Sequence, residues 1–179
     1  MDPFATLGIE RTFDVDLAVV EKTHRELSRT LHPDKHASGG ASARRYALSK
    51  AIEVNEAWRI VKDPIRRAEA LFVLADVPVG ETNEPKPSPD FLMDMMEQRE
   101  TLAEARANHD LNAARALGGE IQVRAKRAEH ALSEGFAKAK GDREELLPLV
   151  SKLGELRFYR RFMDEVSELE DVALASAGA

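Results

Sequence analysis

Apolar positions recur every three or four residues along most of the chain, which is the spacing of one face of an α-helix. Before position 75 this pattern predicts a helix from about Leu17 to Leu31, N-capped by Asp16, and a second from about Ser42 to Lys62. A third, short helix begins at Pro64 after the cap Asp63 and runs toward Leu74. The first two helices form an antiparallel pair whose inward residues are Leu17, Val20, His24, Leu27 and Leu31 on one helix and Ala47, Ala51, Val54, Trp58 and Val61 on the other. We interpret His24 and Trp58 as packed core residues.

A proline-rich segment separates these helices from a second set. Four of the eight prolines lie within residues 76–89, where they favour extended backbone over helix: Pro78, Pro85, Pro87 and Pro89. Beyond it we expect helices from Pro89 to about Ala107, from Asp110 to about Lys140 and from Asp142 to about Val172, with a bend near Pro148 and a kink near Gly118. The pattern thus predicts an all-α protein: a helical hairpin with short helices over residues 1–75, a linker over 76–89, and a three-helix bundle over 90–179 whose tail frays from about Ala173.

Composition supports helix and narrows the function. The chain has 179 residues, 43% of them hydrophobic and 32% charged, and no cysteine, which excludes disulfides, thiolate metal sites and a cysteine nucleophile. Residues 1–75 hold 12 Lys and Arg against 11 Asp and Glu, whereas residues 76–179 hold 14 against 21, so we expect no nucleic-acid partner. No apolar run approaches the roughly 18 residues of a membrane span and the N-terminus does not read as a signal peptide, so we expect a cytoplasmic protein without a membrane partner.

The loop between the first two helices carries the tripeptide His32-Pro33-Asp34. Pro33 fixes its own φ and disfavours helix at His32, so the helix must stop and two polar side chains are presented on a constrained loop. Asp34 can accept a bidentate hydrogen bond from a partner arginine, and His32 can donate or accept near neutral pH. A separate face of the preceding helix carries three basic residues, Lys22, Arg25 and Arg29. Their positive charge would steer an acidic partner toward the loop.

In this context residues 1–75 resemble a J-domain, the module by which co-chaperones stimulate the ATPase of DnaK-type chaperones. Over nearly its whole length the chain resembles the HscB family, called Jac in yeast mitochondria. Four segments carry the resemblance: Met1-Asp2-Pro3-Phe4-Ala5-Thr6-Leu7-Gly8, His32-Pro33-Asp34-Lys35-His36-Ala37-Ser38-Gly39, Arg67-Ala68-Glu69-Ala70-Leu71 and Phe91-Leu92-Met93-Asp94-Met95-Met96-Glu97-Gln98-Arg99-Glu100. The resemblance implies that an HscA-like, DnaK-type chaperone binds His32, Pro33, Asp34, Lys35, Lys22, Arg25 and Arg29.

The first helix after the linker has more apolar surface than one bundle seam needs. The residues with the spacing of a bundle seam are Phe91, Met95, Leu102 and Ala105. A second side of the helix is apolar in its N-terminal turns and acidic in the turns that follow. The resemblance implies that this second face binds IscU, the scaffold of iron–sulfur cluster assembly, through Leu92, Met93, Met96, Glu97, Glu100 and Glu104, with Phe158 from the last helix. In the alternative, Leu92, Met93 and Met96 pack under the first domain or the linker, and Phe158 belongs to the core.

The resemblance implies a co-chaperone that captures the scaffold, docks on the chaperone and promotes cluster transfer through the partner's ATP hydrolysis. The chain has no phosphate-cradling glycine motif, so we expect neither an enzyme nor a bound cofactor. One alternative is a J-domain co-chaperone for general unfolded clients. Another is a small hydrolase or metalloenzyme built on His32, Asp34 and glutamates, but a nucleophile, an oxyanion device and a converging ligand set are lacking, so we expect no metal.

Overall fold

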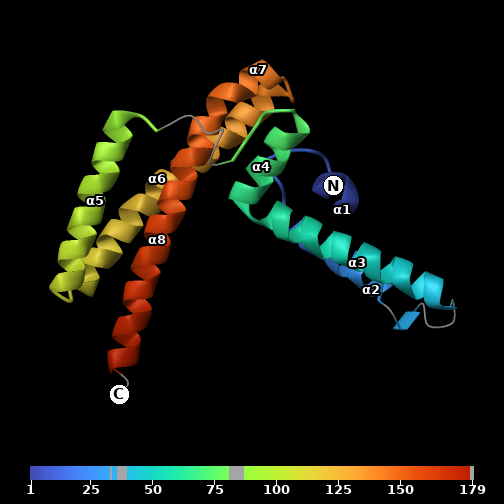
Figure 1. Ribbon diagram of the computed structural model, residues 1–179, viewed down its shortest axis with the longest axis horizontal. Helices are drawn as coiled ribbons and strands as arrows, with labels where there is room; N and C mark the ends of the chain where they lie inside the picture. Colours follow the sequence, from blue (N-terminus) through green and yellow to red (C-terminus); the bar gives the residue numbers. More distant parts are fainter. Residues whose placement is uncertain (33, 36–39, 81–86, 178–179) are drawn as a thin grey trace. The chain divides into compact units, whose positions relative to one another are not determined.

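The computed structural model describes residues 1–32, 34–35, 40–80 and 87–177, and these residues form helices, turns and connecting segments without a β-strand (Figure 1). The predicted all-α architecture is confirmed. Internal contacts divide the chain into two compact units. The first comprises Met1–Val79 with Phe136–Leu146, and the second comprises Gly80–Gly135 with Leu147–Ala179. Among the described residues, none of the helices combines the length and apolar character needed to span a bilayer.

The first unit is built on a helical hairpin. Its helices are α1 (Pro3–Leu7), α2 (Leu17–Thr30), α3 (Gly40–Lys62) and α4 (Pro64–Leu74). Helices α2 and α3 lie side by side, and α1 and α4 both contact α3 (Figure 1). The buried side chains at these contacts include Phe4, Leu7, Val20, Val54, Val61 and Phe72. The hairpin therefore holds the loop that follows α2 at its far end, away from most of this core.

Aspartate caps set the helix starts that the sequence predicts. One carboxylate oxygen of Asp16 accepts hydrogen bonds from the backbone N–H groups of Ala18 and Val19, at 3.0 and 3.2 Å. Asp63 caps α4 in the same way, and Pro64 occupies the first helical position, where its missing N–H costs nothing. The predicted starts of α2 and α4 are thus confirmed.

Residues 136–146 pack with the first unit, although the sequence pattern assigns them to the C-terminal bundle over residues 90–179. The ring of Phe136 stacks on Phe13, with centroids 5.6 Å apart, and lies 4.9 Å from the ring of Phe72. Arg143 Nε donates a hydrogen bond to the backbone oxygen of Asp76 at 3.0 Å. Helix α6 (Leu111–Ala139) consequently contributes its last residues to one unit and the rest to the other.

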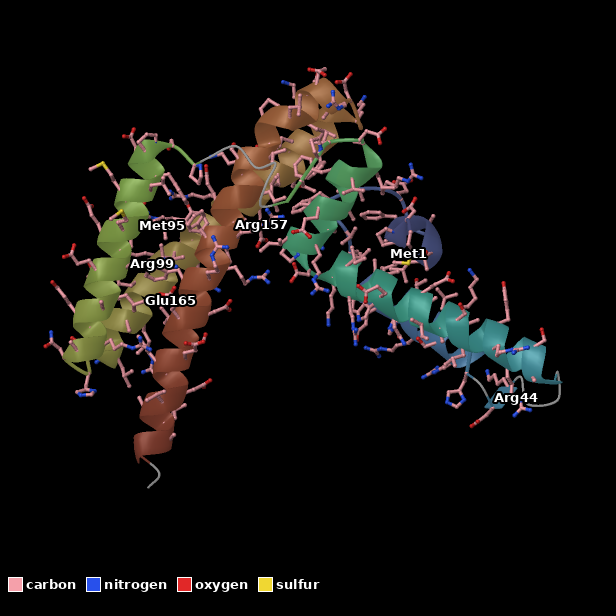
Figure 2. All side chains as sticks on the ribbon, in the orientation of Figure 1. Met1, Arg44, Met95, Arg99, Arg157 and Glu165 are labelled. Carbon is pink, nitrogen blue, oxygen red and sulfur yellow. The ribbon has the colours of Figure 1, made fainter. Side chains whose placement is uncertain are left out.

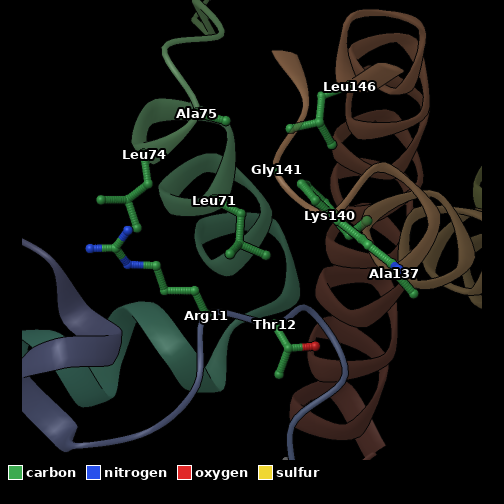
Figure 3. Close-up of a pocket in the computed structure, with 10 residues that line it drawn as sticks. Arg11, Thr12, Leu71, Leu74, Ala75, Ala137, Lys140, Gly141 and Leu146 are labelled. Carbon is green, nitrogen blue, oxygen red and sulfur yellow. The ribbon is translucent and has the colours of Figure 1, made fainter. Parts of the chain in front are cut away.

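A cavity of about 450 Å³ lies beside these aromatic contacts in the first unit (Figure 3). Leu71 and Leu74 of α4 and Leu146 of α7 (Arg143–Leu146) form apolar parts of its wall, and Arg11 and Lys140 add cations. The Arg11 guanidinium is engaged by Asp2, with Nη2 2.7 Å from Asp2 Oδ2. The cavity contains none of the predicted site residues in its lining.

The second unit is a three-helix bundle of α5 (Pro89–Ala107), α6 up to residue 135, and α8 (Val150–Ala177). Ser88 caps α5, and Asp110 accepts from the N–H of Ala113 at 2.9 Å at the start of α6, as the sequence predicts for this boundary. The buried bundle core includes Met95, Leu102, Ile121, Leu132, Leu153, Leu156, Phe162 and Val166. This core leaves the opposite face of α5 to solvent.

Two parts of the last predicted helix differ from expectation. Residues 142–172 do not form one helix: α7 is followed by a 3-10 turn over Leu147–Leu149, η2, before α8 begins, because Pro148 has no N–H to continue an α-helical ladder. The tail expected to fray from about Ala173 is instead helical to Ala177, since alanine-rich sequence has high helix propensity.

Gly118 allows close packing and does not break α6. We expected Gly118-Gly119 to weaken α6 at this point. The helix nevertheless continues across both glycines without a break. A Cβ atom at Gly118 would lie 3.2 Å from Val166 Cγ1 on α8, which is tighter than ordinary van der Waals contact. The glycine therefore lets α6 and α8 approach closely in the middle of the bundle.

Candidate functional site

The loop after α2 presents His32 and Asp34 to solvent. Helix α2 ends where the N–H of Leu31 donates to the carbonyl of Leu27, and the N–H of Lys35 donates to the carbonyl of His32 at 3.0 Å. The His32 side chain is 59% exposed and that of Asp34 is 89% exposed. Pro33, the central residue of the tripeptide, lies outside the described residues, as do residues 36–39.

His32 and Asp34 are close enough to influence each other. His32 Nδ1 lies 3.5 Å from Asp34 Oδ2 and 3.4 Å from the backbone nitrogen of Asp34. In a neutral ring Nδ1 accepts from that N–H and the proton resides on Nε2, and in a charged ring both nitrogens carry protons. In both states Nε2–H remains a donor, while the Asp34 carboxylate stays accessible as an acceptor.

The basic face of α2 is exposed and only partly neutralised. Lys22, Arg25 and Arg29 are all exposed, as is Lys35 in the loop. Arg25 Nη2 lies 2.5 Å from Glu21 Oε1 one turn earlier, whereas within the described chain Lys22 and Arg29 have no carboxylate partner. The uncompensated charge of this face therefore lies at its two ends.

His24 and Trp58 are half-buried, so their assignment to the packed core is only partly right. Their rings stack with centroids 5.5 Å apart, and His24 Nε2 lies 2.9 Å from Asn55 Oδ1. The ring stack joins the two residues across the α2–α3 seam, and both remain partly open to solvent. The stack joins α2 to α3 behind the basic face.

Helix α5 has one buried and one exposed apolar side. Met95, Leu102 and Ala105 are buried and Phe91 is half-buried, which confirms the predicted seam. The remaining apolar side chains are exposed, Leu92 by 38%, Met93 by 62% and Met96 by 70%. Within the second unit, these three side chains therefore lie outside the bundle core.

An acidic row continues along this exposed side. Glu97, Glu100 and Glu104 are spaced three and four positions apart, so they lie on one face of α5 together with Met93. All three are exposed, and in the part of the chain that the structure describes none of them pairs with a cation. We call Leu92, Met93, Met96, Glu97, Glu100 and Glu104 the α5 face.

Other charges on α5 are paired within the bundle. Arg99 Nη2 donates to Glu165 Oε1 of α8 at 2.8 Å (Figure 2). Asp94 accepts a hydrogen bond from Arg124 Nη1 of α6. These pairs hold α5 to both neighbouring helices. The unpaired glutamates differ from them in pointing away from the bundle.

Phe158 of α8 borders the α5 face. Its ring is half-buried and packs edge-on against Phe91, with centroids 5.6 Å apart. The Arg161 guanidinium carbon lies 4.5 Å from the centroid of the same ring. Arg161 is not among the residues that the sequence pattern identifies, and its position three residues after Phe158, on the same helical face, is the one signal for it.

Acidic and imidazole groups do not converge on a metal site in this structure: over the described ranges, three or more His, Asp or Glu side chains are nowhere grouped so as to hold an ion. His36, which lies near the tripeptide, is outside those ranges. The loop and the α5 face are both exposed surfaces, the first polar and the second apolar with an acidic row.

Two family models match the chain in order, the DnaJ domain over residues 2–70 and the HSCB C-terminal oligomerisation domain over residues 87–167. A co-chaperone protein HscB homolog from Neisseria meningitidis is 33% identical over 164 residues, covering 92% of this chain and 96% of the relative. The structure of chaperone HscB from Vibrio cholerae is 27% identical with a TM-score of 0.81, and the match covers 96% of this chain and 98% of that one. The crystal structure of human co-chaperone protein HscB, 20% identical over 95% of this chain and 82% of its own, shares the fold with a TM-score of 0.83.

The similarity spans both units and nearly all of the described residues. It includes the segment with His32 and Asp34 inside the DnaJ match and the whole α5 face inside the HSCB C-terminal match. The match with the Neisseria meningitidis relative covers 92% of this chain and therefore includes residues of both units. The chain therefore belongs to the HscB family of J-domain co-chaperones.

Proposed function

We propose that the chain binds an IscU-type iron–sulfur scaffold through the α5 face and Phe158, and delivers it to an HscA-like, DnaK-type chaperone whose ATPase its J-domain stimulates. Membership of the HscB family assigns the chain to iron–sulfur cluster biogenesis, and the proposal names the two partners and the residues that hold them. The observation that carries it is the α5 face, where three large apolar side chains are exposed next to three glutamates that pair with no cation among the described residues.

The α5 face is costly for the isolated protein. Glu97 and Glu100 are three positions apart and Glu100 and Glu104 are four apart, and like charges at such spacings destabilise a helix by about 0.2–0.5 kcal/mol per pair. Exposed methionines add apolar surface without packing gain, yet their flexible side chains adapt well to a partner. A partner that covers the apolar residues and brings basic groups to the glutamates would offset both costs.

The loop side of the J-domain supports the second half of the proposal. Asp34 has an exposed carboxylate that can receive the guanidinium of a partner arginine, and His32 keeps an Nε2–H donor beside it. Lys22 and Arg29, which have no carboxylate partner in the part of the chain that the structure describes, extend positive charge along α2 toward this loop. An acidic surface on the chaperone ATPase is the complement that these groups favour.

Carrying both surfaces on one chain has a kinetic consequence. A scaffold held on the second unit is presented to the chaperone that binds the first unit at a high effective concentration, without any new contact between the two partners. ATP hydrolysis and the conformational change that traps the scaffold then belong to the chaperone. We accordingly propose that the chain itself is not an enzyme, in agreement with relatives that are co-chaperones.

The test uses the purified full-length chain, a cluster-free IscU-type scaffold and an HscA-like chaperone. Calorimetry should detect a complex of the chain with the scaffold, and steady-state ATP hydrolysis by the chaperone should rise with the chain and rise further with chain and scaffold together. A chain that ignores the scaffold but binds reduced, unfolded lactalbumin would overturn the scaffold assignment and favour a co-chaperone for general unfolded clients.

A further inference from the structure

Arg161 is an exposed cation held at the border of the α5 face. Its guanidinium carbon lies 4.5 Å from the centroid of the Phe158 ring, and the same ring is in T-shaped contact with the ring of Phe91. Neither an ion pair nor another polar contact involves Arg161 within the part of the chain that the structure describes. The aromatic ring thus supports the guanidinium from one side and leaves its N–H groups facing solvent.

The spacing along α8 places Arg161 on the side of α8 that faces α5. Phe158, Arg161 and Glu165 follow each other at intervals of three and four, so they share one face of the helix. That face meets α5 at two points, because Phe158 packs on Phe91 and Glu165 accepts a hydrogen bond from Arg99 at 2.8 Å. Arg161 lies between these two contacts.

The same reasoning orders the residues across α5. Leu92 and Met96 precede Arg99 by seven and three positions, so they lie on the side of α5 that faces α8. Glu97, Glu100 and Glu104 lie on the far side of this apolar strip, in line with Met93. The exposed surface therefore has a cation at one border, apolar residues in the middle and three carboxylates at the other border.

We propose that Arg161 is part of the partner-binding surface and holds a carboxylate of the scaffold, which makes that surface bipolar; this inference rests on the proposed function. The scaffold accordingly presents basic groups to the α5 glutamates and an acidic group to Arg161. An arginine suits this position because its planar group stacks on Phe158 and still offers a fork of donors to a carboxylate.

A bipolar surface selects a partner by orientation as well as by charge. A purely basic peptide would satisfy the glutamates but would place positive charge against Arg161, and like charges across an interface are strongly unfavourable. A folded scaffold with both charges in the correct positions avoids this repulsion. Arg161 is therefore a specificity-determining residue, whereas Leu92, Met93 and Met96 provide the apolar centre.

The experiment compares Arg161→Glu, Arg161→Gln and Arg161→Lys with the matched control Lys126→Glu, which reverses an exposed charge on α6. Affinity and association rate with cluster-free IscU-type scaffold are measured at low and high salt. We expect Arg161→Glu to weaken binding by about tenfold, Arg161→Gln by less, and Lys126→Glu hardly at all, with the differences shrinking at high salt. Arg161→Lys should keep most of the association rate, because it retains the charge, and should dissociate faster, because it loses the fork.

A second arm tests the scaffold carboxylate directly. Each exposed Asp or Glu of the scaffold is changed to Lys in turn, and one of these variants should restore affinity for the Arg161→Glu chain while weakening affinity for the unmodified chain. If the unmodified chain binds scaffold and Arg161→Glu and Arg161→Gln bind equally well, the inference is overturned and the proposed function stands. If the unmodified chain does not bind scaffold, the proposed function is overturned and the inference with it.

Discussion

The ring of Phe158 meets the ring of Phe91 edge-on, with centroids 5.6 Å apart and planes at 75°. Phe158 is half-buried and packs against α5 through this ring contact. Replacing it by alanine would loosen α5 and would also remove one of the proposed scaffold contacts. The exposed members of the α5 face are better sites for substitution, because their truncation should affect scaffold binding more than folding.

The simultaneous change of Leu92, Met93 and Met96 to alanine should lower scaffold affinity by at least about tenfold. These side chains form the apolar centre of the surface, where single truncations often cost about 1–2 kcal/mol or more. Calorimetry with cluster-free scaffold measures the loss. Basal stimulation of the chaperone ATPase should persist, because His32 and Asp34 lie in the other unit, whereas the additional stimulation by scaffold should disappear.

The control for this triple variant is Val123→Ala, which truncates another exposed apolar residue but on α6. It should bind scaffold normally. A triple variant that unfolds would mean that the three residues support the fold, and one that folds and binds with unchanged affinity would place the scaffold site elsewhere.

Changing Glu100 to glutamine should stabilise the chain and weaken scaffold binding together. Glu100 is the central residue of the acidic row, so its neutralisation relieves repulsion with both Glu97 and Glu104, by about 0.2–0.5 kcal/mol per pair. Urea unfolding should therefore shift to higher midpoint, while the association rate with scaffold falls most clearly at low salt. Equal effects at low and high salt would contradict the electrostatic role of this row.

Local chemistry explains which parts of the fold could be predicted from the sequence. Asp63 followed by Pro64 marks the start of α4, and Asp110 marks the start of α6, because a cap satisfies N–H groups only two or three residues away. The exposed side of α5 was equally predictable, since the seam residues Met95 and Leu102 leave Met93 and Met96 on other faces of the same helix.

Contacts between residues far apart in sequence were not predictable in this way. No residue near Phe136 in the sequence indicates that its ring packs on Phe13 and Phe72. The hydrophobic pattern of α6 assigns Phe136 to that helix but does not identify its contacts. Arg161 likewise gains its significance from the Phe158 ring and the nearby α5 helix. Sequence periodicity gives the face of a helix, whereas tertiary packing decides which partner that face meets.

Replacing His32 by glutamine or Asp34 by asparagine should leave the helical circular dichroism and the melting temperature unchanged, because both side chains are largely exposed. Stimulation of the chaperone ATPase should be lost. Glutamine keeps a donor but not the imidazole geometry, and asparagine keeps the shape of Asp34 but cannot provide a charged acceptor for an arginine. Full stimulation by either folded variant would refute the role of the tripeptide.

Arg29→Ala and Arg25→Ala should both slow docking on the chaperone, because each lowers the net charge of the basic face of α2 by one. Both residues belong to the basic face of α2, but the Arg25 guanidinium already lies 2.5 Å from the Glu21 carboxylate, whereas Arg29 lacks such a partner among the described residues. Removing Arg25 consequently also leaves Glu21 unpaired, so its individual effect mixes a lost cation with a freed anion. Glu21→Gln, which frees the Arg25 charge instead, should accelerate docking.

Stopped-flow association rates at low and high salt measure these changes. We expect a decrease of about threefold for Arg29→Ala at low salt, with little change in the dissociation rate, because charges at an interface rim act mainly on encounter. The differences among the variants should vanish as the Debye length falls from about 10 Å at 0.1 M salt to about 3 Å at 1 M. If the rates of all three variants and of the unmodified chain are the same at low salt, the basic face does not contribute to docking, and recognition depends on the loop that carries His32 and Asp34 alone.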